Sequence, residues 1–202
     1  MSSQVDTSKD SALRMVGRTV VNFQRLEHNL KLAARLGPLR GTVQKVQKDI
    51  AKRHERASAL TLGQAIQAWL DYCSGHPATH YETPDLFDVS VEMTFTLESD
   101  PESQARHAKA LCDLLEVRND LIHSRLAKFE WESPEACQGL VEELEQVNTS
   151  ISMQMEYTCA LLKAIAELHK EHAESLAAQF ASGAPIVAEA MPNNSLERTR
   201  EG

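Results

Sequence analysis

One short segment, from Val117 to His123, combines an arginine, an asparagine and a histidine in a pattern that suits chemistry on a phosphate ester. Arg118 offers a planar fork of N–H donors that matches two phosphate oxygens, a geometry that lysine lacks. A histidine ordinarily titrates near neutral pH, so His123 is a candidate proton carrier. Asn119 can donate to the phosphate or hold the histidine in one tautomer. We therefore predict Arg118, Asn119 and His123 as catalytic residues.

The reaction that these residue types suit best is the cleavage of RNA. The 2′-hydroxyl attacks the adjacent phosphorus, a histidine moves protons, and a fixed cation stabilises the equatorial oxygens. Because the nucleophile belongs to the substrate, we expect no metal ion and no cofactor. DNA lacks the 2′-hydroxyl, so this chemistry selects RNA.

The spacing of the motif predicts a site shared between two chains. On a regular α-helix Arg118 and His123 lie about 140° apart around the axis. Two copies of the helix around a two-fold axis could bring both residue types to one phosphate. Leu115, Leu121 and Ile122 would supply apolar contacts around this polar centre. We therefore expect a homodimer.

A structural interpretation of the same residues is also open. Arg118 could form a surface ion pair with Glu116 or Asp120, and His123 could be an ordinary, partly buried histidine. Under this interpretation the segment has no role in catalysis.

The segment from Arg118 to His123 resembles the R-x4-H motif of the HEPN superfamily, all-helical domains found in many toxin and defence ribonucleases. The resemblance implies an all-α, up-and-down helical bundle over about residues 8–180 and a metal-independent endoribonuclease with a dimeric site. Its partners would be an RNA substrate, a second copy of the chain and an antitoxin or inhibitor protein. The alternative function is a non-catalytic helical module that dimerises through the same helices and binds a partner protein.

The C-terminal segment Pro192–Arg200 resembles the read-through peptide that recombination sites add to proteins encoded on bacterial integron gene cassettes. Such cassettes often contain toxin–antitoxin or phage-defence genes. The resemblance concerns genetic origin, and it implies a bacterial toxin–antitoxin or phage-defence setting for the predicted ribonuclease.

The first element expected around the motif is a long helix over about residues 8–36. Its apolar residues recur at steps of three and four; they are Leu13, Val16, Val20, Phe23, Leu30 and Ala34. Glu27 falls at a position of this apolar stripe, where a carboxylate needs a positive partner. Either Arg118 or His123 is that partner, which makes Glu27 a supporting residue of the site, or Glu27 reaches solvent or the nearby Arg25 and Lys31.

The remaining periodicity predicts helices over residues 42–59, from Thr61 to about 73, from Pro101 to about 128, and from Pro134 to about 180. The last is one very long helix or two helices joined near residues 148–152. Strict alternation from Val89 to Leu97 predicts a short β insertion around 89–98. Its mate is either a nearby segment or the same strand of a second subunit. We expect a single domain over residues 1–181 and a disordered tail over 182–202.

A basic stretch between residues 40 and 56 is the second candidate site. It has six cations against two carboxylates and could attract an RNA backbone; the cations are Arg40, Lys45, Lys48, Lys52, Arg53 and Arg56. The alternative is an ordinary solvated helix face. The net charge of −8 arises from the acidic segment 130–174, so it does not exclude an anionic ligand.

The composition of the 202 residues, 42% apolar and 25% charged, is that of a globular protein. There is no long apolar run, and residues 1–6 do not resemble a secretion signal, so we expect a cytoplasmic protein. The four cysteines are scattered, which argues against a disulfide framework. The nearest approach to a metal motif, Cys73-x2-His76-x3-His80, has no evident fourth ligand, and we expect no metal site.

Overall fold

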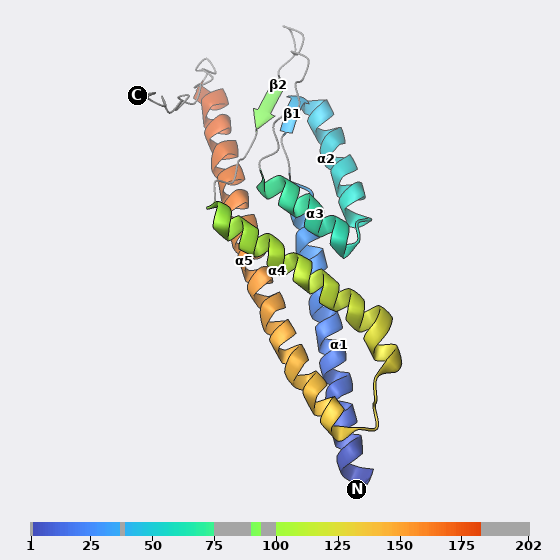
Figure 1. The fold of residues 1–202 in the computed structure, drawn as a ribbon. Helices are drawn as coiled ribbons and strands as arrows, with labels where there is room; N and C mark the ends of the chain where they lie inside the picture. The colour runs from blue at the N-terminus through green and yellow to red at the C-terminus, as the bar shows by residue number, and fades with distance from the viewer. Residues whose placement is uncertain (1, 37–38, 75–89, 94–99, 183–202) are drawn as a thin grey trace, which may run out of the picture. The chain divides into compact units, whose positions relative to one another are not determined.

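The computed structural model describes residues 2–36, 39–74, 90–93 and 100–182 (Figure 1). The helices are α1 (Ser2–Ala33), α2 (Val43–Ser58), α3 (Leu62–Cys73), α4 (Pro101–Asp120), the π-helix η1 (Leu121–Arg125), the 3₁₀-helix η2 (Leu126–Lys128) and α5 (Pro134–Ser182). Two short strands, β1 (Leu39–Thr42) and β2 (Ser90–Met93), accompany them. The predicted all-α class with a long C-terminal helix is confirmed. No helix among the described residues has the length and apolar character needed to cross a membrane.

The chain divides into two compact units, residues 1–162 and 163–202. The packing described below is that of the first unit. The predicted tail, apart from Ser182, lies outside the described residues, and the single domain over 1–181 stays a prediction.

Side-chain caps fix where the helices begin. The Thr61 hydroxyl accepts from the Gln64 N–H, and the Gln64 side chain accepts in return from the Thr61 N–H at 2.9 Å, so a capping box opens α3. Asp100 accepts from the Ser103 N–H at 2.9 Å, and Pro101 occupies the first turn of α4. These two predicted starts are therefore confirmed, because a cap depends only on residues within one turn of it.

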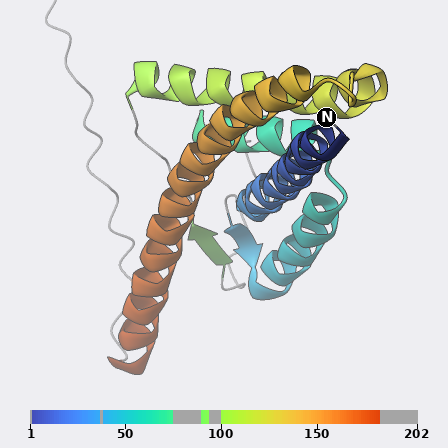
Figure 2. The same ribbon diagram turned by 90° about the horizontal axis from the view of Figure 1, so that it is seen from below.

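α1 and α5 lie side by side and run parallel (Figure 1). Two hydrogen bonds between them show the direction, because residue numbers rise together in both helices: Thr19–Asn148 at 2.9 Å and Asn29–Cys159 at 3.2 Å. The ion pair of Lys9 with Glu132, just before the start of α5, follows the same order at 2.5 Å. α4 runs antiparallel to α5, and α3 lies between α1 and α4 and runs antiparallel to α4 (Figure 2). The helices α3, α4 and α5 therefore alternate in direction, as the predicted up-and-down bundle requires.

The buried face of α1 differs from the predicted one by one residue at every second position. Ala12, Thr19, Leu26 and Ala33 are fully buried, together with Phe23 and Leu30. The apolar pattern predicts Leu13, Val20, Glu27 and Ala34 there, whereas Leu13 is 46% exposed. The prediction was wrong because it preferred the apolar Val20 to Thr19, which is buried through hydrogen bonds that the pattern does not reveal.

Those hydrogen bonds form a small polar network between α1 and α5. The Thr19 hydroxyl donates to the Met15 carbonyl at 2.9 Å and accepts from the Asn148 amide at 2.9 Å. The Asn148 oxygen accepts from Asn22 at 2.8 Å. Asn148 thus uses its polar atoms on α1 rather than on its own backbone, which would interrupt the helix. Of the two arrangements considered, one long helix or two, the structure has one helix that continues through Asn148.

Two apolar clusters hold the first unit together. The larger joins α1, α3, α4 and α5 around Trp69, Leu26 and Leu111. The smaller joins the N-terminal half of α1, η1 and the start of α5 around Leu121 and Leu140. The end of α4 is therefore anchored from two sides.

The predicted β insertion is confirmed over residues 90–93, and residues 94–98 lie outside the described part of the chain. β2 pairs antiparallel with β1, with Leu39 opposite Met93 and Thr42 opposite Ser90. Of the two pairing partners considered for this strand, a nearby segment or a second subunit, the structure has the segment of the same chain. β1 leads directly into α2, whose first turn is capped by Thr42.

The set of buried residues on α1 can be tested by substitution. We expect Leu26→Ala to lower the free energy of unfolding by about 2–5 kcal/mol, because it opens a cavity at a fully buried position. Glu27→Ala, one residue away, should cost less than about 1 kcal/mol, because a partly exposed ion pair contributes little. Urea denaturation followed by circular dichroism measures both. If the two substitutions lowered the free energy of unfolding equally, the burial of Leu26 rather than Glu27 would be contradicted.

Candidate active site

The motif predicted to be catalytic lies where α4 changes into a π-helix. Arg118 and Asn119 belong to the last turn of α4, and His123 lies in η1. The Leu126 N–H donates to the Leu121 carbonyl, five residues earlier, which is the hydrogen bond of a π turn. The sequence predicted a regular helix through Lys128, and this prediction was wrong about the helix type from Leu121 on. π turns are rare and occur often at functional sites.

The π turn alters the angle between Arg118 and His123. A π turn holds more residues than an α turn, so each residue advances by less than 100° around the axis. Two of the five steps from Arg118 to His123 lie in η1. The two side chains are therefore separated by less than the 140° of a regular α-helix, and the single chain itself brings them closer to a common face.

Arg118 is half-buried and hydrogen-bonded to its neighbour. Its Nη1 donates to the Asn119 Oδ1 at 3.0 Å. In the part of the chain that the structure describes, no ion pair joins Arg118 to Glu116 or Asp120. The guanidinium is thus oriented by a neutral amide, which leaves its positive charge available to an anion.

Asn119 and His123 are exposed and lie four residues apart on the outer side of the helix. His123 is therefore not the partly buried histidine of the structural interpretation. Next to it, Ile122 is 36% exposed. Leu121, which was expected to contact a second copy, is only 2% exposed and packs in the core of its own chain. That expectation was wrong because the side chain points toward α1 and α5.

An ion pair that the sequence did not predict holds η1 against α5. Arg125 donates through Nη1 and Nη2 to the two carboxylate oxygens of Glu143, the second bond being 2.5 Å long. This hydrogen bonding raises the pKa of Arg125 and lowers the pKa of the Glu143 carboxyl. A bidentate arginine–carboxylate pair fixes orientation as well as distance. It therefore positions the segment that contains His123.

Glu27 pairs with a neighbour on its own helix and not with Arg118 or His123. Lys31, one turn later on the same helix, approaches the Glu27 carboxylate at 2.7 Å, and both side chains are largely shielded. With Leu26 as the buried residue, Glu27 stands at the edge of the core. The local ion pair satisfies the carboxylate, so its charge needs no contact with the motif.

Most of the predicted RNA-binding residues line one stripe of α2. The stripe consists of residues spaced by three or four that are all exposed: Lys45, Lys48, Lys52 and Arg56. Arg53 is half-buried on another face of the helix, and Arg40 lies in β1. The stripe ends six residues before Leu62, and the neighbouring Gly63 packs against Leu115, one turn before Arg118. The basic stripe therefore leads toward the motif end of α4.

No cluster of three or more candidate metal ligands occurs within residues 2–36, 39–74, 90–93 and 100–182. His76 and His80 of the weak metal motif lie outside these ranges.

No family model, no curated protein and no solved structure matches this chain. The candidate site is therefore defined by its own geometry and residue types.

The Arg125–Glu143 pair can be tested without assuming any activity. We expect Glu143→Gln to accelerate amide hydrogen exchange in η1 and, above all, at the Leu126 N–H that closes its π turn, because the ion pair that holds η1 on α5 is lost. The loss in global stability should stay below about 1 kcal/mol, since both side chains are partly exposed. Hydrogen exchange monitored by NMR measures both effects.

Two controls accompany this test. The exposed Glu145→Gln should leave exchange in η1 unchanged. Because the native pKa of Glu143 is lowered, its contribution should be present above the ordinary carboxyl value of 4.5 and should vanish as the pH falls through the native pKa. Unaltered exchange in the Glu143→Gln variant at neutral pH would show that the pair does not hold η1.

Proposed function

We propose that this protein is a metal-independent endoribonuclease of the HEPN type that acts in a bacterial toxin–antitoxin or phage-defence system. The observation that supports this most is the junction of α4 and η1. It presents an arginine oriented by a neutral amide and an exposed histidine, at a smaller angle around the axis than on a regular α-helix. These are the two groups that cleavage of RNA through its 2′-hydroxyl needs.

In the proposed reaction His123 takes the proton of the attacking 2′-hydroxyl or returns a proton to the leaving 5′-oxygen. Arg118 binds the non-bridging phosphate oxygens and stabilises the charge that accumulates on them in the transition state. Asn119 holds the guanidinium in place through its side-chain oxygen, which leaves its amide group to donate to the phosphate. The Arg125–Glu143 pair positions η1 and takes no part in the chemistry.

A symmetric dimer supports this reaction better than a single chain. An exposed site alone lacks the shielded surroundings in which charge stabilisation is strongest. Two copies that meet along the outer side of α4 and η1 would place two arginines and two histidines in one cleft. The exposed Ile122 beside His123 would contribute apolar contact area to that interface.

The basic stripe of α2 supports RNA rather than another phosphate ester as the substrate. Lys45, Lys48, Lys52 and Arg56 follow one line along the helix, as the successive phosphates of a strand would require. Such contacts bind the backbone without reading the sequence, so they extend the site beyond the scissile phosphate.

We expect His123→Ala to lower the rate of RNA cleavage about 10²–10⁴-fold, the usual effect of losing a general acid or base. Arg118→Lys should also be severely impaired, because it keeps the charge but loses the bidentate geometry. Cleavage of a short labelled RNA in excess EDTA measures both. Matched controls are His172→Ala and Arg106→Lys, which alter exposed residues outside the motif and should cleave normally.

The products identify the mechanism independently of the variants. Cleavage by the 2′-hydroxyl yields a 2′,3′-cyclic phosphate and a 5′-hydroxyl, which mass spectrometry resolves. Ends that bear a 5′-phosphate, or a requirement for Mg²⁺, would indicate a metal nuclease instead. A folded wild-type protein that cleaves no RNA but dimerises and binds a partner protein would favour the non-catalytic alternative.

The shared site makes a prediction about mixed dimers. We expect inactive Arg118→Ala and inactive His123→Ala chains to recover part of the activity when they are mixed and allowed to exchange subunits. The shared cleft of a mixed dimer would then keep one intact arginine, from one chain, and one intact histidine, from the other, and one residue of each type should support partial activity. Light scattering gives the stoichiometry. A monomer that cleaves RNA at the full wild-type rate would refute the dimeric site.

A further inference from the structure

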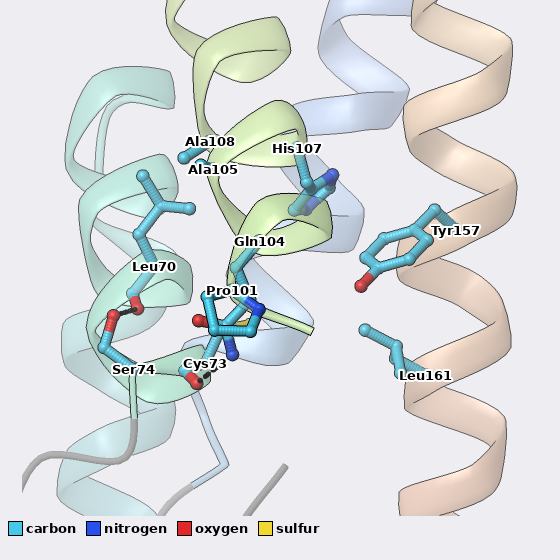
Figure 3. A pocket seen from close by; sticks show the side chains of 10 residues that line it. All are labelled: Leu70, Cys73, Ser74, Pro101, Gln104, Ala105, His107, Ala108, Tyr157 and Leu161. Atoms are coloured by element: carbon cyan, nitrogen blue, oxygen red, sulfur yellow. Dashed lines mark hydrogen bonds between the residues drawn. The ribbon is translucent and has the colours of Figure 1, made fainter. Parts of the chain in front are cut away.

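A cavity of about 420 Å³ lies at the opposite end of α4 from the motif, where the end of α3 and the start of α4 face α5. Figure 3 shows Leu70 and Pro101 on one side of it and Tyr157 and Leu161 of α5 on the other. Its size falls within the range of about 300–1,000 Å³ that is typical of small-molecule sites. None of the side chains used in the proposed ribonuclease site lines it.

The described lining of this cavity is uncharged. It consists of aliphatic, aromatic and neutral polar side chains, together with Cys73 and His107. Burial raises the pKa of the Cys73 thiol to about 11, so the thiol stays protonated at neutral pH. Burial also lowers the pKa of His107, which keeps the imidazole neutral. A charged guest would lose its hydration here without gaining an opposite charge, which is strongly unfavourable.

The imidazole of His107 forms a rigid, flat wall. Its Nε2 accepts from the Trp69 indole N–H at 2.8 Å, so its Nδ1 is protonated and donates to the Gln154 oxygen at 2.5 Å. Both ring nitrogens are thereby engaged by other side chains. The Tyr157 ring follows at 4.3 Å between centroids. These two rings offer a guest aromatic surface rather than polar atoms.

The polar groups at the cavity include both donors and acceptors, and two of them already donate within the protein. The Gln104 amide nitrogen donates to the Cys73 carbonyl at 3.3 Å, and the Ser74 hydroxyl donates to the Leu70 carbonyl at 2.8 Å. The Gln104 oxygen and the lone pairs of the Ser74 hydroxyl remain as acceptors. The Tyr157 hydroxyl points toward the space between Leu161 and Gln104 (Figure 3). A guest with one hydroxyl donor would match this arrangement.

We propose that this cavity is a binding site for a small, uncharged molecule with a flat apolar body and one hydroxyl group. The proposal is independent of the proposed ribonuclease activity, because it rests on the volume and the neutral lining of the cavity.

The probe for this site is 1-naphthol, with 1-naphthalenesulfonate as a comparator that has the same rings and a negative charge. We expect 1-naphthol to bind the full chain with a stoichiometry of one and to raise its melting temperature, whereas the sulfonate should do neither. Isothermal titration calorimetry and thermal unfolding at pH 7 measure this. Failure of 1-naphthol to bind, or equal binding of the two compounds, would overturn the proposal.

Substitutions locate the bound probe. Ala108→Leu fills the cavity from α4 and should weaken 1-naphthol binding at least about tenfold. Ala160→Leu makes the same change at an exposed position of α5 and should leave binding unaltered. If Ala108→Leu does not fold, Ala105→Leu serves in its place, since Ala105 lines the cavity but is exposed on α4. Undiminished binding to a folded, filled variant would place the probe elsewhere and refute the site.

Discussion

Three polar side chains of α5 each bind another helix and so fix where α1, α4 and η1 lie along α5. Asn148 binds α1 through Thr19 and Asn22, Gln154 binds α4 through His107, and Glu143 binds η1 through Arg125. Apolar contacts tolerate sliding by a fraction of a turn, whereas a buried amide whose partner moves away loses its hydrogen bond at a cost of about 1–3 kcal/mol. α5 therefore determines the positions of the other three helices along its axis. The proposed ribonuclease site and the proposed cavity both take their shape from it.

The sequence predicted the elements that depend on nearby residues and missed those that depend on distant ones. The starts of α3 and α4 are encoded within one turn by Thr61 and Asp100, and both were found. The choice between Thr19 and Val20 for the core is decided by Asn148, which lies 129 residues away, and the apolar pattern chose wrongly. His107 was missed for the same reason, because nothing near it shows that Trp69 and Gln154 will satisfy both of its nitrogens.

In the candidate site, too, some features depend on nearby residues and others on distant ones. Residue types and spacing alone were enough to single out Arg118, Asn119 and His123. The change to a π-helix was not predictable, because Glu143, which anchors Arg125, belongs to another helix 18 residues further on. The π turn weakens the angular argument for a dimer, because it reduces the angle around the axis between Arg118 and His123 that a second chain would have to compensate. Shielding of the exposed His123 then becomes the stronger reason for a dimer.

The ribbon of β1 and β2 gives the molecule an uneven local stability. Two four-residue strands alone are marginal in water, and they close a loop that contains α2 and α3. α3 is anchored by Trp69 in the main core, whereas in α2 Ala57 is the one buried residue among the described side chains. Opening of the ribbon would therefore release α2 at little cost while the other helices stay folded. The lysines of the basic stripe thus stand on a helix with little buried apolar area. Under the proposed function, α2 would adjust to the path of a bound RNA strand without disturbing the core.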